Sequence, residues 1–274
     1  MLNEDLISVV MSAFNESEDW FCKSLESIIN QTYKNIEIIL IIDNPLNGNI
    51  IKKANYYKDI DSRIRLFINE ENRGLVWCLN EGIRLSKGKF IARMDSDDIS
   101  DPTRLQKQLS YMNSNDECVL VGSQMRLINE IDNEIEKKEK LPTEYNKIKR
   151  ILKYSNVMCH PSFMFKKDFV KKIGAYREIA YAEDYDLITR IIMNGGIIEN
   201  LPETLIRYRV RSNGICKSNI NVQQQSERFV KKNFRKNNID NNIINYKNTK
   251  PLTLISKLRR KKDRTIYRLL MYRY

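Results

Sequence analysis

Three carboxylates fall within four residues in the segment Lys89-Phe90-Ile91-Ala92-Arg93-Met94-Asp95-Ser96-Asp97-Asp98. Its first half is short and apolar, which predicts a buried strand with the acidic residues at its carboxyl end, where open α/β sheets bind ligands. Clustered like charges repel unless a cation joins them, and oxygen ligands suit Mg²⁺ or Mn²⁺, ions often shared with substrate phosphates. The spacing predicts a divalent metal on Asp95 and Asp97, with Asp98 behind them or capping the next helix. A solvated acidic turn is the alternative.

The composition is that of a folded protein with one distinctly basic end. The chain has 274 residues, enough for one large α/β domain or two small ones, and 42% of them are hydrophobic. The sequence predicts neither a membrane span nor a secretory signal. Five scattered cysteines without a Cys-X-X-Cys pair favour a reducing cytoplasm over a disulfide framework or a zinc site. Residues 250–274 contribute +8 to the net charge of +12.

Strands and helices are expected to alternate along the first half of the chain, which indicates βαβ units and a parallel sheet. Apolar runs predict strands at 6–11, 36–42, 63–68, 118–122 and directly before Asp95. Helical periodicity covers 18–29, 50–58, 75–85, 144–154, 169–173, 183–193 and 218–236, and Asp101-Pro102 opens a further helix. Residues 123–142 are expected to form a hairpin or mobile connection, 197–210 two short strands, and 237–249 a linker. Trp20 and Trp77 fit packing positions and are assigned to the core.

Five motifs occur in a defined order along this framework. They are Ser12-Ala13-Phe14-Asn15-Glu16; Gln31-Thr32-Tyr33 before the strand that ends in Asp43; Asn72-Arg73-Gly74-Leu75 leading to Leu79-Asn80; Arg93-Met94-Asp95-Ser96-Asp97-Asp98; and His160-Pro161-Ser162 followed by Gly174-Ala175-Tyr176 and Glu183-Asp184-Tyr185-Asp186. Together they make residues 5–215 resemble the inverting, nucleotide-sugar-dependent glycosyltransferases of family 2. Arg93 before the cluster, followed by Arg104 and Gln108, resembles bacterial enzymes that add hexoses to O-antigen or capsule repeat units.

The resemblance implies the GT-A fold, an α/β, Rossmann-like architecture with a mostly parallel central sheet and helices on both faces. It assigns residues 1–215 to the glycosyltransferase domain. Residues 216–249 would then form a helix and an Asn-rich linker. Residues 250–274 would form a basic C-terminal extension.

The resemblance also implies roles for the acidic residues near position 184. Inverting transfer needs a carboxylate to take the proton of an acceptor hydroxyl, which is a poor nucleophile. Asp184 aligns with that base, Glu183 would position it or the acceptor, and Asp186 is assigned a structural role. The departing diphosphate develops negative charge, which the metal on Asp95 and Asp97 would neutralise.

The donor is expected to be a UDP-sugar bound near the end of the first strand. The resemblance implies donor contacts for Ala13, Phe14, Glu16, Asp43, Arg73 and Asp95. The family's usual Asp-Asp after the second strand is here Asp43-Asn44-Pro45, so one carboxylate remains for the base or ribose. Arg73 either faces the diphosphate or is a solvated loop cation. His160 either completes the metal shell, contacts the acceptor, or is a satisfied core or loop residue.

The C-terminal segment combines basic and apolar residues. Two apolar patches flank Arg259-Arg260-Lys261-Lys262: Leu252, Ile255 and Leu258 on one side, and Ile266, Leu269 and Leu270 on the other. A basic amphipathic segment suits an anionic bilayer surface, which fits an acceptor carried on a polyprenyl diphosphate. The expected location is therefore cytoplasmic, peripheral on the inner face of the cell membrane. A solvated helix or disordered end is the alternative, and without a reader motif no nucleic-acid partner is expected.

The predicted function is transfer of a hexose from a nucleotide sugar to a hydroxyl of a lipid-linked saccharide in bacterial surface polysaccharide synthesis. UDP-galactose, UDP-glucose or an N-acetyl derivative is the favoured donor. The non-enzyme alternative is a membrane-peripheral binding protein with an idle nucleotide-sugar site. A phosphatase of the haloacid dehalogenase type would carry its Asp-X-Asp on the first strand and Thr or Val where this chain has Ile99. A nucleotidyltransferase would need a Gly-rich basic loop after the first strand, where this chain has Ser12 to Glu16.

Overall fold

A computed structural model describes residues 5–135, 140–212, 219–239 and 254–272, with the side chains of 254–260 outside the description. The strands are β1 (Ile7–Ala13), β2 (Ile36–Ile42), β3 (Ile64–Ile68), β4 (Phe90–Asp95), β5 (Ile99–Ser100), β6 (Cys118–Ile128), β7 (Met164–Lys166) and β8 (Ile197–Arg209). The helices are α1 (Glu18–Ile29), α2 (Gly48–Ile60), α3 (Leu75–Leu85), α4 (Arg104–Ser114), α5 (Tyr145–Ile151), α6 (Lys167–Lys172), α7 (Glu183–Met193), α9 (Ile220–Lys236) and α10 (Leu254–Tyr272), with a 3₁₀ turn, η1, at His160–Ser162.

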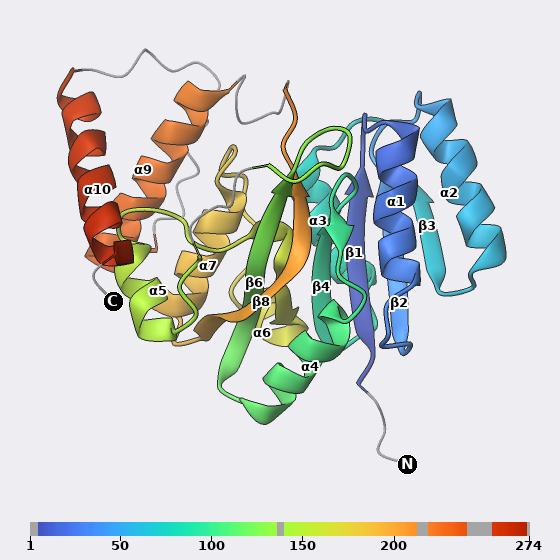
Figure 1. The fold of residues 1–274 in the computed structure, drawn as a ribbon, viewed down its shortest axis with the longest axis horizontal. Helices are drawn as coiled ribbons and strands as arrows, with labels where there is room; N and C mark the ends of the chain where they lie inside the picture. Colours follow the sequence, from blue (N-terminus) through green and yellow to red (C-terminus); the bar gives the residue numbers. More distant parts are fainter. Residues whose placement is uncertain (1–4, 136–139, 213–218, 240–253, 273–274) are drawn as a thin grey trace.

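The strands form a single mixed sheet in the order β3-β2-β1-β4-β7-β6-β8-β5 (Figure 1). The predicted parallel arrangement holds from β3 to β4, and β6 also pairs in parallel with β8. The short strands β7 and β5 run antiparallel to their neighbours. In the central register Ser12 lies opposite Asp95 and Ala13 opposite Ile42, so the carboxyl ends of β1, β2 and β4 meet at one edge. The predicted site segments therefore share that edge.

Helices cover both faces of the sheet, as predicted (Figure 1). The strand β2 shows why, because its side chains alternate between two cores: Ile38 and Leu40 pack with α1, α2 and α4, whereas Ile39 and Ile41 pack with the core that includes α3, α5, α7 and α9. A strand buried on both faces must be apolar throughout, and β2 is buried along its whole length.

Several predicted boundaries differ from those of the structure. The strand β6 continues to Ile128, so residues 123–128 belong to the sheet, while 136–139 lie outside the described residues. Residues 197–209 form one strand instead of two. Its pairing with β6 shifts between Leu201 and Thr204, across Pro202, which has no N–H for the ladder. The proline therefore disturbs the register without ending the strand. Trp77 is 37% exposed, so its assignment to the core was wrong.

A buried ion-pair network fixes α7 to the segment before it. Asp186, which is buried, accepts hydrogen bonds from the Nε atoms of Arg190 at 2.7 Å and Arg177 at 2.9 Å. Arg190 also donates to the carbonyl oxygens of Ile173, at 2.8 Å, and Ala175. Asp186 thus has the structural role expected for it, and it orients the helix whose first turn carries Glu183 and Asp184.

We predict that Asp186→Ala lowers the free energy of unfolding by about 3–5 kcal/mol, because it leaves Arg190 and Arg177 without their shared anion. Urea denaturation followed by circular dichroism measures the change. Asp168→Ala, at an exposed position in α6, is the control and should change the value by no more than about 0.5 kcal/mol. Equal effects of the two substitutions would contradict the proposed importance of the network.

Candidate active site

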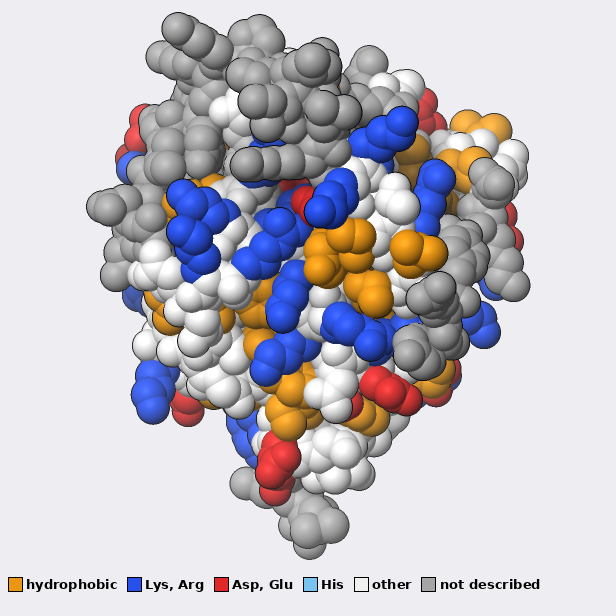
Figure 2. All heavy atoms as spheres, turned by 90° about the vertical axis from the view of Figure 1, so that its left-hand side faces the viewer, with side chains coloured by type: hydrophobic (Ala, Val, Ile, Leu, Met, Phe, Trp, Pro, Cys, Tyr) orange, Lys and Arg blue, Asp and Glu red, His pale blue; other side chains and the backbone are white. Residues whose placement is uncertain are grey.

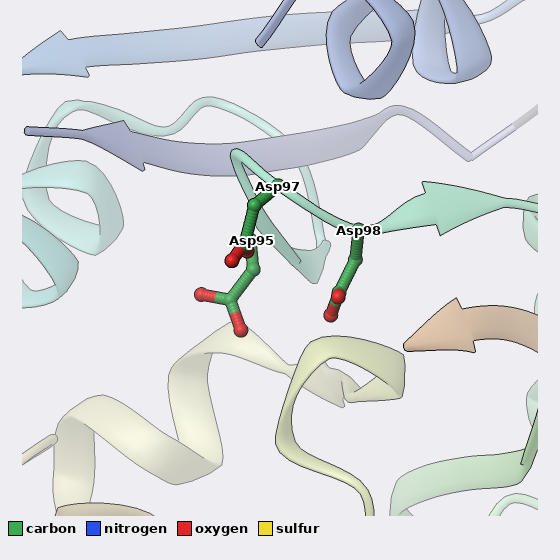
Figure 3. A group of neighbouring side chains, drawn as sticks. All are labelled: Asp95, Asp97 and Asp98. Atoms are coloured by element: carbon green, nitrogen blue, oxygen red, sulfur yellow. The ribbon is translucent and has the colours of Figure 1, made fainter. Parts of the chain in front are cut away.

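The three predicted acidic residues converge at the carboxyl end of β4. Asp95 is the last residue of β4, and Asp97 and Asp98 lie in the turn before β5. One carboxylate oxygen from each lies within 4.8 Å of the other two, and Figure 3 shows all three side chains reaching to the same side of the turn. Ser24 of α1 donates its hydroxyl to the carbonyl of Asp95 at 2.7 Å. The turn is therefore held against α1 with its acids facing outward from the sheet edge.

The electrostatics of this group fit a cation. Burial and the neighbouring Asp95 carboxylate raise the pKa of Asp97 to about 6, and burial together with Asp97 raises the pKa of Asp98. The Oδ1 atom of Asp98 accepts a hydrogen bond from the backbone N–H of Arg209 at 2.7 Å, whereas its buried Oδ2 atom has no hydrogen-bond partner in the described structure. Crowded carboxylates with a spare oxygen match the ligands that Mg²⁺ and Mn²⁺ prefer.

Two arginines neutralise part of this negative charge. The buried guanidinium of Arg93 forms a two-point ion pair with Asp95. Arg211, which directly follows Val210 after β8, pairs with Asp97 and lies 3.4 Å from the carboxylate of Glu16. Arg211 is therefore an internal counter-ion at the place where the sequence predicts a metal.

Sequence reasoning missed the residues that β8 brings to the site. Arg209 and Arg211 alternate along an extended segment, which places both side chains on one face. Both guanidinium groups lie 5.2 Å from the ring centroid of Trp20, whose Nε1 donates to the carbonyl of Glu130 at 3.0 Å. Trp20 is thus a platform for two arginines, and its assignment to the core was wrong. The sequence feature that could have identified these site residues is Arg209-Val210-Arg211 at the end of an apolar strand.

The predicted base lies at the start of α7, held by two donors. Asn156 donates its side-chain amide to Oδ2 of Asp184 at 2.8 Å, and the N–H of Tyr185 donates to Oδ1 at 2.6 Å. Burial raises the pKa of Asp184 to about 6, although these hydrogen bonds and Arg93 oppose the shift. Burial and the Asp184 charge raise the pKa of Glu183 to about 8. Asp184 is therefore the more readily ionised of the two.

Arg93 connects the two acidic groups, which are about 90 residues apart in the sequence. Its charge lowers the pKa of both Asp184 and Glu183 while it pairs directly with Asp95, and the Asp95 charge in turn raises the pKa of Glu183. The end of β4 and the first turn of α7 are therefore close enough for their charges to interact. The predicted metal ligands and the predicted base lie within electrostatic reach of the same arginine.

His160 faces the same arginine but has another partner. Its Nε2 atom lies 2.9 Å from the hydroxyl of Tyr176, and its ring packs edge-on against Phe163. Burial and the charge of Arg93 lower the pKa of His160, so the ring is neutral at neutral pH. The group of potential metal ligands found among the described residues consists of the three aspartates without His160. Its predicted part in metal or acceptor binding stays a prediction.

The residues predicted to contact the donor surround the ends of β1 and β2. Ala13 is buried, Phe14 is 36% exposed, and Glu16 accepts a hydrogen bond from the N–H of Phe14 at 2.7 Å. Their predicted contacts with the nucleotide stay predictions. The exposed ring of Phe14 is a surface on which a base could stack.

Asp43 organises the loop before α3. It accepts hydrogen bonds from the Asn69 side chain at 2.6 Å and from the N–H groups of Arg73 and Gly74 at 2.9 Å each. The φ angle of Gly74 is +85°, a conformation that glycine adopts without strain. The side chain of Arg73 is 50% exposed and pairs with Glu71 at 3.2 Å, as a solvated loop cation does. If Asp43 contacts the nucleotide base or the ribose, it does so with a carboxylate that already accepts three hydrogen bonds.

We predict that Arg211→Gln strengthens Mn²⁺ binding in the absence of donor by about 3–10-fold, because the ion no longer competes with an internal cation for Asp97. Titration with Mn²⁺ followed by electron paramagnetic resonance, at about pH 8 so that Asp97 is ionised, measures the affinity. The control is Arg126→Gln, at an exposed arginine paired with Glu134. Unchanged or weaker binding by the Arg211 variant would show that this side chain does not compete with the metal.

Comparison of the sequence with those of known proteins identifies a family. The family model described as "Glycosyl transferase family 2" matches residues 8–174. The chain is 37% identical over 239 residues to the O-antigen biosynthesis glycosyltransferase WbnJ of Escherichia coli, an alignment that covers 86% of this chain and 92% of WbnJ.

Solved structures share the fold at low sequence identity. Residues 1–349 of S. aureus TarS, in complex with UDP-GlcNAc, superpose with a TM-score of 0.67 and 17% identity over 82% of this chain, which spans 65% of that longer chain. The mannosyltransferase PcManGT of Pyrobaculum calidifontis, in complex with GDP-Man and Mn²⁺, gives a TM-score of 0.66 and 15% identity over 97% of this chain and 70% of its own. The fold is therefore that of GT-A glycosyltransferases, and the match of the family model together with the identity to WbnJ shows that the chain belongs to glycosyl transferase family 2.

Proposed function

We propose that this glycosyltransferase transfers a hexose from a UDP-sugar, with inversion, to a hydroxyl of a lipid-linked saccharide during synthesis of a bacterial surface polysaccharide. The observation that carries the proposal is the ion pair of Arg93 with Asp95, together with the effect of the Arg93 charge on the carboxylates at the start of α7. A metal-and-diphosphate site and a proton acceptor must flank one sugar for this reaction, and the two acidic groups offer that pairing.

Asp184 is the proposed general base. The acceptor oxygen forms a bond to the anomeric carbon while its proton passes to the Asp184 carboxylate, and the bond from that carbon to the diphosphate oxygen breaks with its electrons leaving on UDP. Asn156 and the N–H of Tyr185 hold both oxygens of Asp184, which fixes the direction of proton transfer. Glu183, with its raised pKa, keeps a proton near neutral pH and would position Asp184 or the acceptor by hydrogen bonding.

Asp95 and Asp97 are the proposed ligands of a Mn²⁺ or Mg²⁺ ion, with the free oxygen of Asp98 close by. A bound divalent ion would supply positive charge for the departing diphosphate. Asp97, which pairs with Arg211, would be freed for the metal if that ion pair opened, and the Arg211 guanidinium could then pair with the same diphosphate. The complexes of TarS with UDP-GlcNAc and of PcManGT with GDP-Man and Mn²⁺ support a nucleotide sugar and a metal in this fold.

The acceptor class and the location are inferred from the name of one relative reported above. WbnJ is named for O-antigen biosynthesis, which supports a saccharide acceptor on a polyprenyl diphosphate and a position on the inner face of the cell membrane. No helix within the described ranges is long and apolar enough to cross a bilayer. The membrane contact proposed here is peripheral.

The rival functions make different predictions for turnover. A phosphatase of the haloacid dehalogenase type would carry its nucleophilic aspartate after the first strand, whereas the Asp-X-Asp of this chain begins at the end of β4. A binding protein with an idle site would retain a nucleotide sugar without releasing UDP. Measured turnover therefore separates the proposed enzyme from the binding protein.

We expect UDP release from at least one of UDP-galactose, UDP-glucose and their N-acetyl derivatives in the presence of Mn²⁺, and loss of that release with a chelator. A coupled assay for free UDP, run with GDP-mannose alongside, identifies the donor. Release of GDP alone would contradict the UDP assignment, and full turnover in the chelator would contradict the metal dependence.

We predict that Asp184→Asn lowers the rate of transfer at least about 100-fold while UDP binds with nearly unchanged affinity, because the amide cannot accept the proton. In the wild type the base is active when ionised, so the rate should rise with pH through about 6 and then level off. The variant should lack this rise. Asp168→Asn, in the exposed part of α6, is the control. Turnover of the Asp184 variant at the wild-type rate would exclude it as the base.

A further inference from the structure

The positive charge of this protein is concentrated at one end of the molecule. The helices α5, α9 and α10 carry formal charges of +3, +4 and +6. Their sum exceeds the +12 of the whole chain, so the other residues together carry −1. The three helices lie side by side at the end of the sheet beyond α7 (Figure 1). The net positive charge of the chain is therefore carried by these three helices.

The helix α10 is docked onto this end instead of extending from it as a separate tail. Tyr267, Leu270 and Met271 pack against the core that includes α7 and α9. The side chains exposed on the described part of α10 recur with the helical period: Lys261, Lys262, Arg264, Thr265, Arg268 and Leu269. The inner face thus seals the core, and the outer face presents four cations and a half-exposed leucine.

Arg235 of α9 ties the three helices together. Its guanidinium pairs with Asp263 of α10 at 3.0 Å, and its Nε donates to the carbonyl of Lys153, just after α5, at 2.7 Å. The same guanidinium lies 4.9 Å from the ring centroid of Tyr154. Asp263, the acidic residue of α10, is used in this internal contact. The neighbouring cations are thus left facing outward on one continuous surface.

We propose that the surface formed by α5, α9 and α10 docks on an anionic lipid bilayer. Figure 2 shows Lys and Arg side chains spread across the described part of this face with apolar side chains between them and few acidic ones. Exposed cations come from all three helices, for example Lys149 of α5, Lys232 of α9 and Arg268 of α10. A broad basic surface with interspersed apolar groups complements anionic headgroups over an apolar layer.

The position of the active site supports a bilayer as the occupant, and this step rests on the proposed function. Glu227 of α9 is near enough to Asp184 to raise its pKa, and Asn156, which follows α5, holds the Asp184 carboxylate. The docking surface therefore adjoins the side of the site that carries the proposed base. A saccharide attached to a membrane lipid would approach Asp184 from that side.

Binding of the full-length protein to vesicles tests the proposal. Vesicles of phosphatidylcholine with about 30% phosphatidylglycerol should bind the protein much more tightly than phosphatidylcholine alone, and salt should weaken binding. The variant Lys149→Glu/Lys232→Glu/Arg268→Glu should bind anionic vesicles at least about 50-fold more weakly. The control Lys52→Glu/Lys58→Glu/Lys107→Glu has the same net charge but changes exposed residues of α2 and α4, and it should stay within about three-fold of the wild type.

Three further measurements make the outcome decisive. The double variant Lys149→Glu/Lys232→Glu leaves α10 unchanged and should still lose at least about ten-fold in vesicle affinity. If it binds like the wild type, or if both triple variants lose equally, the composite surface is wrong. Tighter binding to single-stranded RNA than to anionic vesicles at the same salt would also overturn the proposal. UDP release, assayed without vesicles, should be unchanged in these variants; vesicle binding without any UDP release would contradict the proposed function and leave the docking surface standing.

Discussion

The site depends on the buried guanidinium of Arg93, which pairs with Asp95 and whose charge also acts on the carboxylates at the start of α7. Burial works against the charge of Arg93, but its ion pair with Asp95 and the surrounding negative groups more than compensate, so its pKa is raised. Only arginine remains charged so reliably when it is buried, and its planar group can bind one carboxylate with two hydrogen bonds. The charge of Arg93 also stabilises the ionised forms of Asp184 and Glu183, so it acts on acids from both halves of the chain.

The residues behind Arg93 hold its backbone in place. Arg104, fully buried, donates to the Arg93 carbonyl at 2.6 Å and to Gln108 at 3.0 Å, and burial lowers its pKa to about 9. Gln108 in turn donates to the carbonyl of Ser162 at 2.7 Å. Gln31 accepts a hydrogen bond from Leu105 at 3.0 Å and donates to Asp101 at 2.7 Å. These motif residues act by fixing the end of β4 and the turn after it, since a small displacement of the acids would change every distance in the site.

Positive and negative charge are concentrated in different regions of the molecule. Outside α5, α9 and α10 the chain is almost neutral, yet acidic side chains gather at the end of β4 and the start of α7. Cations, either from the protein itself or from a bound metal, would stabilise the charges of those acids. The basic helices face away from the sheet and carry a field suited to an anionic surface. Contact between α7 and α9 links the two regions, so the orientation of the protein on a surface would also orient its site.

Much of the fold could be predicted because local patterns determine it. The spans of β2, α3 and α7 coincide with the predicted ranges, since apolar runs, helical periodicity and the residues that end each element act over short distances. The placement of Asp95, Asp97 and Asp98 beyond a buried strand followed from the same patterns. The motifs, through their resemblance to a family, supplied the pairing of that cluster with Asp184.

Long-range contacts decided the rest. Local sequence patterns do not predict that β8 is a single strand with a shifted register, or that Arg211 pairs with Asp97. Both features depend on pairing between segments far apart in the chain. Trp20 fits a packing position in α1, yet the end of β8 makes it a platform for arginines. The sequence by itself determined which elements form and which side chains carry charge. Tertiary packing decided which charges meet, because burial and proximity set the strength of every ion pair and the pKa of every acid in the site.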